Sequence, residues 1–310
     1  MPKAEAARSS LRVQTVAHAF TRDTLFRYAE ALAQSLHIAR AAELVGETFV
    51  AIGDCSGKAG LDERTLEALR DVLAVAGSDL TYERFGQNIG HAAGQNRLFK
   101  QNRSALLLLC NDDVVTGPQA VSELVRGLIA RPEVGLIEAH QLPFEHPKQY
   151  DLVTGETGWC SLACALTPAK IFSKLGGLDA ESFFLHGADV DYSWRVRLAG
   201  YQCIYRSSAR VVHDKRVDSS GALLISPREA QYMVEADLLL SQKYGEPRRF
   251  DDVLAWYTEH GSDVQRQAAA ALGKRRAAGR LPTPVPDAER VAFFRDGFYA
   301  VHRFGVSFGS

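Results

Sequence analysis

The chain has 310 residues, of which 46% are hydrophobic, so it can bury the core of one large domain or two smaller ones. Its 36 Lys and Arg residues nearly balance its 37 Asp and Glu residues, which leaves no cationic field to drive sequence-independent binding of nucleic acid. The five cysteines are odd in number and include no Cys-x-x-Cys pair, which argues against a disulfide framework and a structural zinc site.

Targeting signals are not evident in the sequence. Residues 1–12 carry charges and small side chains but no apolar stretch of a secretory signal. No apolar run approaches the roughly eighteen residues that a membrane-spanning helix needs. We therefore expect a soluble protein of the reducing cytoplasm, with any membrane contact limited to the inner face.

Strands and helices are predicted to alternate through the first half of the chain. Short apolar runs predict strands, and apolar residues three and four apart predict helices. The strands are expected over residues 13–19, 48–52, 80–85, 105–110 and 134–139, and the helices over residues 24–39, 61–76, 91–102 and 119–130. This alternation predicts an α/β fold with a mostly parallel, doubly wound sheet.

The second half is less regular. A strand is expected over 159–166, followed by a short helix that begins at Pro168 and ends at Gly176-Gly177. A helix is expected over 189–199, because Val190, Trp194 and Leu198 lie on one stripe. Short strands are then expected over 201–205 and 209–212, and helices over 227–244 and 265–278.

Two of the predicted strands end in acidic residues. The apolar run Leu106–Cys110 leads directly into Asn111-Asp112-Asp113, and the strand over 48–52 leads into Gly53-Asp54. Open α/β sheets bind ligands at the carboxyl ends of their strands, so these acids suit a metal-bound phosphate or a nucleotide. An ordinary turn is the alternative interpretation, because Asn and Asp dominate turns.

Seven segments carry a resemblance to a known family. They are Ile52–Ser56, Asn88–Asn96, Asn111–Asp113, Trp159–Cys164, Gly176–Asp179, Asp189–Arg195 with Gly200-Tyr201, and Val211–His213. In this order they resemble inverting family-2 glycosyltransferases with the GT-A fold, over about residues 13–213. The resemblance implies a Rossmann-like GT-A domain over 1–220, with a donor half over 11–140 and an acceptor and catalytic half over 141–220, and a helical C-terminal extension over 221–310.

By this resemblance, the nucleotide binds at the carboxyl ends of the first strands. Asp54 would accept a hydrogen bond from the ring N–H of a uracil or thymine base. The turn at His18 would line the same pocket, through its backbone, because Phe20-Thr21 replaces the Tyr-Asn pair usual in the family. Asn88 would bind the nucleotide at a glycine-rich helix start, although such glycines often serve packing alone.

The resemblance also implies a metal site. Asp113 is the predicted ligand, with Asp112 near the ribose or sharing the coordination, and His213 is the partner from the other half of the domain. Carboxylate, imidazole and diphosphate suit Mn²⁺ or Mg²⁺. Such an ion would act as a Lewis acid toward the departing nucleoside diphosphate. A strand-end histidine without a ligand role is the alternative for His213.

Asp189 and Asp191 fall in the first turn of a predicted helix. Residues two apart point about 200° from each other around a helix, so at most one of them faces the active site. The resemblance favours Asp189 as the general base that deprotonates the acceptor hydroxyl. Asp191 and Trp159 are further substrate-binding candidates, although bracing the helix suits Asp191 better. The helix dipole alone would also favour acids here.

Two positions depart from the family pattern. Ala188 replaces the Glu usual before Asp189, which removes a charge that could raise the pKa of the base. Leu162 replaces a Gly where a sugar would approach, so we expect it to narrow the approach. These departures leave a catalytically impaired nucleotide-sugar-binding module as the alternative function. A nucleotidyltransferase is a second rival, but residues 16–23 offer no Gly-rich basic loop.

The resemblance predicts an enzyme of polysaccharide biosynthesis that moves a sugar from a dTDP- or UDP-linked donor to a hydroxyl of a glycan or lipid-linked acceptor. Residues 145–148 and 157–159 resemble rhamnosyltransferase-like members, which makes rhamnose one candidate sugar. The basic run Lys274–Arg276 with Arg280 could touch anionic lipid at a membrane surface. A solvated helix end is the alternative, because cations there are favourable without any ligand.

Overall fold

A computed structural model of the chain describes residues 9–294, apart from positions 19, 58, 59, 145, 147, 216, 218 and 220–222. The described residues form an eight-stranded sheet in the order β3-β2-β1-β4-β7-β6-β8-β5. The strands are β1 Leu11–Ala17, β2 Thr48–Asp54, β3 Ser78–Arg84, β4 Leu106–Cys110, β5 Val114–Thr116, β6 Val134–Leu142, β7 Cys164–Pro168 and β8 Gln202–His213. The predicted α/β architecture is confirmed.

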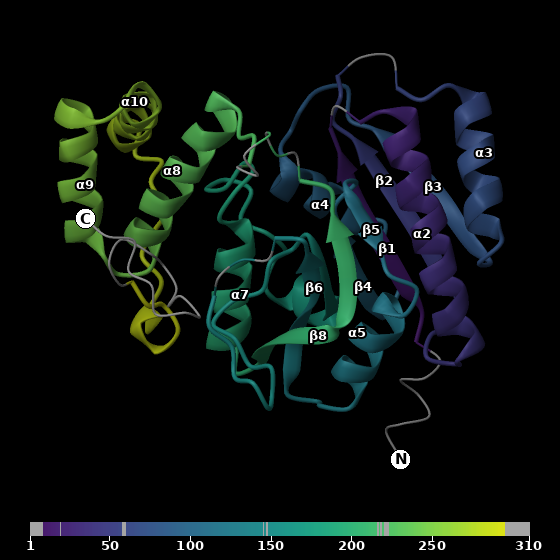
Figure 1. Ribbon diagram of the computed structural model, residues 1–310. Helices are drawn as coiled ribbons and strands as arrows, with labels where there is room; N and C mark the ends of the chain where they lie inside the picture. The colour runs from purple at the N-terminus through teal and green to yellow at the C-terminus, as the bar shows by residue number, and fades with distance from the viewer. Residues whose placement is uncertain are drawn as a thin grey trace.

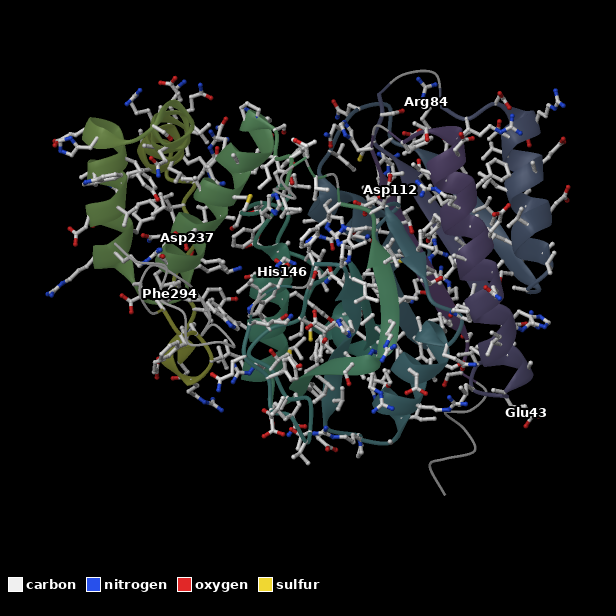
Figure 2. All side chains as sticks on the ribbon, in the orientation of Figure 1. Glu43, Arg84, Asp112, His146, Asp237 and Phe294 are labelled. Atoms are coloured by element: carbon white, nitrogen blue, oxygen red, sulfur yellow. The ribbon has the colours of Figure 1, made fainter. Side chains whose placement is uncertain are left out.

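Strand direction divides the sheet into two parts. β3, β2, β1 and β4 are parallel, as the alternation of strands and helices predicted. β7 is antiparallel to β4 and β6, and β5 is antiparallel to β8, whereas β6 and β8 are parallel, so the rest of the sheet is mixed. Because parallel strands end at one edge, Arg84 and Asp112 lie at the same edge of the sheet, whereas Glu43 lies at the opposite edge (Figure 2). This shared edge is where the acidic residues were expected.

The strand β4 is apolar along its whole length because both of its faces are covered. Leu106, Leu108 and Cys110 enter the core on one face, and Leu107 and Leu109 enter a second core on the other. The first face carries α2 Arg22–Ala41, α3 Glu63–Ala74 and α5 Ala120–Ile129, and the second carries α4 His91–Phe99, α6 Ala169–Lys174 and α7 Ala188–Leu198 (Figure 1). Packing on both faces of β4 therefore fixes the position of Asp112 and Asp113, which follow it.

Three helices follow the sheet, α8 Pro227–Lys243, α9 Pro247–His260 and α10 Asp263–Ala277, and then a short 3₁₀ turn, η1 Ala288–Arg290. In Figure 1 α8 lies beside α7, with α9 and α10 beyond it. Leu238, Leu239 and Leu240 of α8 belong to the same buried core as Tyr192 and Trp194 of α7. The C-terminal helices thus share a core with the sheet domain. The predicted boundary at 220/221 falls on positions outside the described residues.

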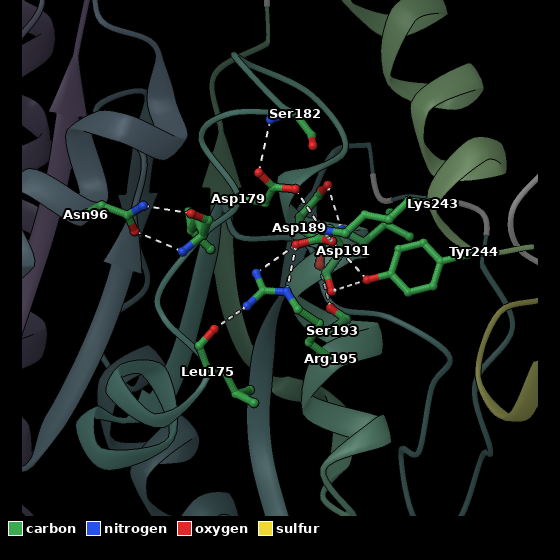
Figure 3. A network of polar contacts seen from close by, with 12 residues as sticks. Asn96, Leu175, Asp179, Ser182, Asp189, Asp191, Ser193, Arg195, Lys243 and Tyr244 are labelled. Carbon is green, nitrogen blue, oxygen red and sulfur yellow. Dashed lines mark hydrogen bonds and ion pairs between the residues drawn. The ribbon is translucent and has the colours of Figure 1, made fainter. Parts of the chain in front are cut away.

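A buried ion cluster joins α8 to the first turn of α7 (Figure 3). We call Asp179, Asp191, Arg195, Lys243 and Tyr244 the Asp191 cluster. Oδ1 of Asp191 accepts from Lys243 Nζ at 2.5 Å and from the Tyr244 hydroxyl at 2.8 Å. Oδ2 accepts from Arg195 Nη2 at 2.7 Å, and Lys243 also reaches Asp179 at 2.7 Å. The Asp191 side chain is 0% exposed, so its charge depends on these partners.

Some predicted elements were wrong in their limits. The strand expected over 159–166 begins only at Cys164, because residues 159–163 form a loop whose polar groups bond to other segments. The two strands expected over 201–205 and 209–212 are one strand, β8, interrupted by a bulge. The short β5 and the helix α9 were missed, since three residues and an amphipathic segment without strong caps give weak signals.

Two expectations from composition can be compared with the structure. No described helix is long and apolar enough to cross a membrane. All five cysteines are free, buried thiols. The cysteines therefore act as small apolar core residues.

We expect Lys243→Met to lower the free energy of unfolding by about 3–5 kcal/mol, because it removes one of the two cations that compensate the buried carboxylates of Asp191 and Asp179. Chemical denaturation at pH 7 measures the loss. Lys274→Met, at an exposed position on α10, is the matched control and should change stability by less than about 0.5 kcal/mol. Equal stability of the Lys243→Met and control proteins would contradict this role of the cluster.

Candidate functional site

The candidate site lies at the edge of the sheet where β1, β2 and β4 end. Asp112 follows β4 there, and a backbone hydrogen bond joins it to His18 after β1. Burial, followed by repulsion from Asp113, raises the pKa of Asp112 to about 7. The side chain of His18 itself is exposed. The structure therefore brings His18, Asp112 and Asp113 to one place, as the sequence predicted.

Asp113 and His213 are brought together by β5. Val114 of β5 pairs with His213 of β8, and the amide of Asp214 donates to the Asp113 carbonyl at 2.8 Å. As a result, Nε2 of His213 lies 3.2 Å from Oδ1 of Asp113. Sequence reasoning joined these two residues by resemblance alone, and the missed strand β5 is the physical cause of their contact.

The ring of His213 is oriented for a cation. Its Nδ1 lies 2.7 Å from Oε1 of Gln141, an acceptor, so Nδ1 carries the hydrogen of the neutral ring. The Nε2 lone pair then faces Oδ1 of Asp113, which is buried and accepts no hydrogen bond. Two facing acceptors fit a cation between them. In the part of the chain that the structure describes, no group of three or more His, Cys, Asp or Glu residues is placed to hold a metal ion.

Asp54 ends β2, as predicted, but it is fully buried. Its Oδ1 accepts from the amide of Ser56 at 2.7 Å, and its Oδ2 accepts from the hydroxyl of Tyr82. Burial and this hydrogen bond raise the pKa of Tyr82 to about 12, so the hydroxyl remains a donor at neutral pH. A base can reach Asp54 only if Tyr82 or the backbone at Ser56 moves.

Asn88 is exposed and shapes the start of α4. Its Oδ1 accepts from the amide of Gly90 at 3.0 Å. A Cβ at Gly90 would lie 2.6 Å from the carbonyl oxygen of Phe184, so this glycine serves close packing. Further along α4, Asn96 exchanges two hydrogen bonds with the backbone of Leu178, at 2.7 and 2.8 Å (Figure 3). The glycine-rich start thus docks α4 onto the loop before α7.

Asp189 lies in the first turn of α7 and is partly exposed. Its Oδ1 accepts from the amide of Val190 at 2.9 Å. Burial raises the pKa of Asp189, and the nearby charges of His186 and Lys148 offset part of this rise. A general base works best when its pKa approaches the working pH, so the environment suits proton acceptance.

Histidines surround this acceptor side. Burial lowers the pKa of His91 to about 4 and the pKa of His146 to about 3, so both rings are neutral at pH 7. His146 contacts the ring of Trp159, with 5.2 Å between ring centroids, and lies beside α7 in Figure 2. His186 is partly buried and lies 3.7 Å from Glu229.

Asp191 and Trp159 occupy different settings. Both oxygens of Asp191 are taken by the Asp191 cluster, so the structure favours the bracing role over contact with substrate. Trp159 is 4% exposed and lines a cavity of about 480 Å³. Trp194, Arg197 and the C-terminal residues Glu289–Phe293 form other walls of this cavity.

The two departures from the family pattern do not obstruct the site. Leu162 is 3% exposed and packs in the core on the α7 face, so the expectation that it narrows the approach of a sugar was wrong. Ala188 is also buried in this core. The physical reason is that residues 159–163 form a loop rather than a strand, which turns Leu162 inward.

The basic run on α10 is largely engaged within the protein. Arg275 donates to the carbonyls of Ser182 and Glu181 at 3.1 and 3.0 Å, and Arg276 pairs with Asp251. These contacts favour the structural interpretation of the run over a lipid-binding surface.

Sequence reasoning missed several charged groups at the site. Lys148 and Glu138 form a buried ion pair, and Lys215 lies near Asp113. Gln141 orients His213, and Tyr82 binds Asp54. The only signal in the sequence is a charged residue within the apolar run over residues 134–139, and that residue is Glu138.

Comparison with solved structures identifies the fold. The chain is similar to a mannosyltransferase of Pyrobaculum calidifontis in complex with GDP-Man and Mn²⁺, with a TM-score of 0.56 and 16% identity over 88% of this chain and 76% of that one. It is also similar to GalNAc-T7 with UDP, GalNAc and Mn²⁺, with a TM-score of 0.57 and 11% identity over 89% and 55% of the two chains. For S. aureus TarS the TM-score is 0.51, with 11% identity over 82% and 44%. The chain has the GT-A fold found in glycosyltransferases, as the resemblance predicted.

Similarity in sequence is confined to parts of curated proteins. The chain is 40% identical over 58 residues to N-acetylglucosaminyl-diphospho-decaprenol L-rhamnosyltransferase of Mycobacterium tuberculosis, which covers 19% of each protein. It is 26% identical over 185 residues to the uncharacterised protein y4gI of Sinorhizobium fredii, which covers 50% of this chain and 20% of that protein. The chain thus spans about a fifth of the length of each relative. No family model matches it.

Gly177→Ala is expected to destabilise the scaffold of the site by about 1–3 kcal/mol more than Gly176→Ala. Both glycines have a positive φ, +74° and +76°, so the backbone strain of the two changes is equal. Only at Gly177 would the new Cβ collide with Asn96, at 2.4 Å from its Oδ1, whereas nothing lies within 4 Å at Gly176. Thermal unfolding of the two variants measures the difference, and equal unfolding temperatures would contradict it.

Proposed function

We propose that the chain is an inverting, metal-assisted glycosyltransferase that moves a sugar from a dTDP- or UDP-linked donor to a hydroxyl of a glycan or lipid-linked acceptor. The single observation that carries the proposal is the pair of facing acceptors, His213 Nε2 and Asp113 Oδ1, 3.2 Å apart at the ligand-binding edge of the sheet. The GT-A fold, shared with structures that hold nucleotide sugars or their parts, supports it.

The nucleotide would bind between β1 and β4. Asp54 would accept the ring N–H of uracil or thymine once Tyr82 moves away and frees its Oδ2. Asp112 would lie at the ribose, with the backbone of His18 beside it. Asn88, at the exposed start of α4, would contact the nucleotide through its amide nitrogen, since its oxygen is used by Gly90.

Asp113 and His213 would hold Mn²⁺ or Mg²⁺, and the diphosphate would complete the coordination. A bound divalent ion supplies Lewis-acid stabilisation of the negative charge on the departing diphosphate. Gln141 keeps the His213 ring in the tautomer that presents Nε2. Lys215, near Asp113, adds a positive charge beside the same phosphates.

Transfer would be a single displacement. Asp189 takes the proton from the acceptor hydroxyl while its oxygen bonds to the anomeric carbon, and the bond from that carbon to the diphosphate oxygen breaks with its electron pair. Attack from the side opposite the leaving group inverts the anomeric centre. The raised pKa of Asp189 makes it a stronger proton acceptor than a solvated carboxylate.

Rhamnose is the candidate sugar. Its support is the short similarity to the mycobacterial enzyme, whose name describes rhamnosyl transfer to a diphospho-decaprenol-linked sugar. Trp159 lies on the acceptor half and offers an aromatic surface to a bound glycan. A lipid-linked acceptor would bring the protein to the periphery of a membrane.

Asp113→Ala should weaken Mn²⁺-dependent binding of UDP or dTDP by at least about tenfold, since even residues behind metal ligands contribute ten- to a hundredfold. Calorimetry with and without Mn²⁺ measures the effect. Thermal stability should not fall, because Oδ1 of Asp113 accepts no hydrogen bond and removing this carboxylate relieves its repulsion of Asp112. The exposed Asp71→Ala is the control. Unchanged metal-dependent binding in Asp113→Ala would refute the metal assignment.

Asp189→Asn should lower kcat about 10²- to 10⁴-fold and leave nucleotide affinity unchanged, because the amide cannot take the acceptor proton. Release of nucleoside diphosphate measures turnover. Asp263→Asn is the matched control, since Asp263 is exposed in the first turn of α10. A wild-type protein that binds donor with Mn²⁺ but never releases nucleoside diphosphate would instead support the binding module.

A further inference from the structure

A buried ion pair lies on the acceptor side of the site. Glu138 of β6 and Lys148 of the loop that follows are paired, and their side chains are 2% and 5% exposed. Oε2 of Glu138 also accepts from the amide of Ser161 at 2.6 Å. Among the described residues, Nζ of Lys148 has no hydrogen-bonding partner beyond this ion pair. Burying two charges carries a large desolvation cost, and apolar residues of similar volume are often at least as stable, so stability alone does not explain this pair.

Hydrogen bonds link this pair to Asp189. Glu138 holds the amide of Ser161, and the neighbouring amide of Cys160 donates to Oγ of Ser193 at 2.9 Å. Ser193 in turn donates to the carbonyl oxygen of Asp189 at 2.7 Å. The start of α7 is therefore fixed, through one short loop, to the strand that carries Glu138.

The same pair fixes Trp159. Nζ of Lys148 lies 4.1 Å from the centroid of the Trp159 ring, a distance at which a cation is attracted to the aromatic face. Lys148 thus contacts both the carboxylate of Glu138 and the ring of Trp159. Two apolar side chains in place of Glu138 and Lys148 could also hold the loop, but they would place no charge near Trp159 and Asp189.

We infer that Glu138 and Lys148 are positioning residues that act through Asp189, and that their opposite charges set how readily Asp189 takes a proton. The inference rests on the proposed function in one respect, the role of Asp189 as the base. This chain has Ala188 where the family usually has a Glu next to Asp189. In the inference, Glu138 on β6 supplies the negative charge near Asp189 instead.

The charges that act on Asp189 come from three segments. Lys148, from the loop after β6, and His186, from the loop before α7, both lower the pKa of Asp189. Glu138, from β6, repels it, since the charge of Asp189 is among the causes that raise the pKa of Glu138 after its burial. His146 lies near both Lys148 and His186, but it is neutral above pH 4. Removing one member of the pair leaves the other uncompensated beside Asp189.

The test is the pH dependence of kcat/KM for nucleoside diphosphate release, whose acid limb reports the base of the free enzyme. Lys148→Met should move this limb up by about one pH unit, and Glu138→Gln should move it down by about as much, because each change removes one nearby charge and the two charges are opposite in sign. Shifts in the same direction, or no shift in either variant, would overturn the inference.

Controls separate charge from packing. Lys148→Arg keeps the charge and should keep the wild-type limb, and Lys170→Met, at an exposed position on α6, should keep it as well. If a single variant does not fold by circular dichroism, the exchange of Glu138→Lys with Lys148→Glu retains an ion pair. The limb of this double variant must still move, and an unmoved limb would overturn the inference.

A second readout needs no turnover. The carboxyl ¹³C resonance of Asp189, assigned by its loss in Asp189→Asn, can be titrated in the wild-type protein and in each variant. Its midpoint should shift in the same opposite directions. If the wild-type protein turns over no donor, the proposed function fails, and this titration still decides the inference. If turnover is normal and the midpoints do not move, the inference fails and the function stands.

Discussion

The carboxylate of Asp191 is buried without contact to solvent, and the rest of the acceptor half depends on the cations that surround it. Arg195 comes from the next turn of α7, but Lys243 and Tyr244 come from the end of α8, about fifty residues later. Because an uncompensated buried charge is strongly unfavourable, α7 cannot take its place without α8. The C-terminal helices are therefore part of the structure that holds Asp189, and Asp179 before α7 is fixed by the same lysine.

Two further constraints place the site around this cluster. The strand β4, buried on both faces, delivers Asp112 and Asp113 to the ligand-binding edge, and β5 then pairs with β8 so that His213 meets Asp113. On the acceptor side, Glu138 and Lys148 fix the loop that touches α7. The acidic residues at the end of β4 and the first turn of α7 are thus held by separate polar networks.

Local pattern predicted the elements that local forces determine. The buried run Leu106–Cys110, the capped helix from Pro227 and the acids at strand ends were all evident in the sequence, because burial and capping follow from neighbouring residues. The contact of Asp113 with His213 needed β5, whose three residues give almost no periodic signal. The pairing of Asp191 with Lys243 joins segments about fifty residues apart, and the pairing of Glu138 with Lys148 depends on how the loop after β6 folds back. Single-sequence patterns encode neither contact. The expectation for Leu162 came from the resemblance alone, which does not show that this side chain packs into the core.

The most direct test of the central claim, that this edge of the GT-A fold is a metal-dependent donor site, is a crystal structure with UDP or dTDP and Mn²⁺, with the ion located by anomalous scattering. The account predicts one Mn²⁺ peak between Asp113 and His213, with the diphosphate on the ion and the base beside Asp54. A nucleotide bound elsewhere, or bound here with His213 still contacting Asp113 and no ion between them, would contradict it.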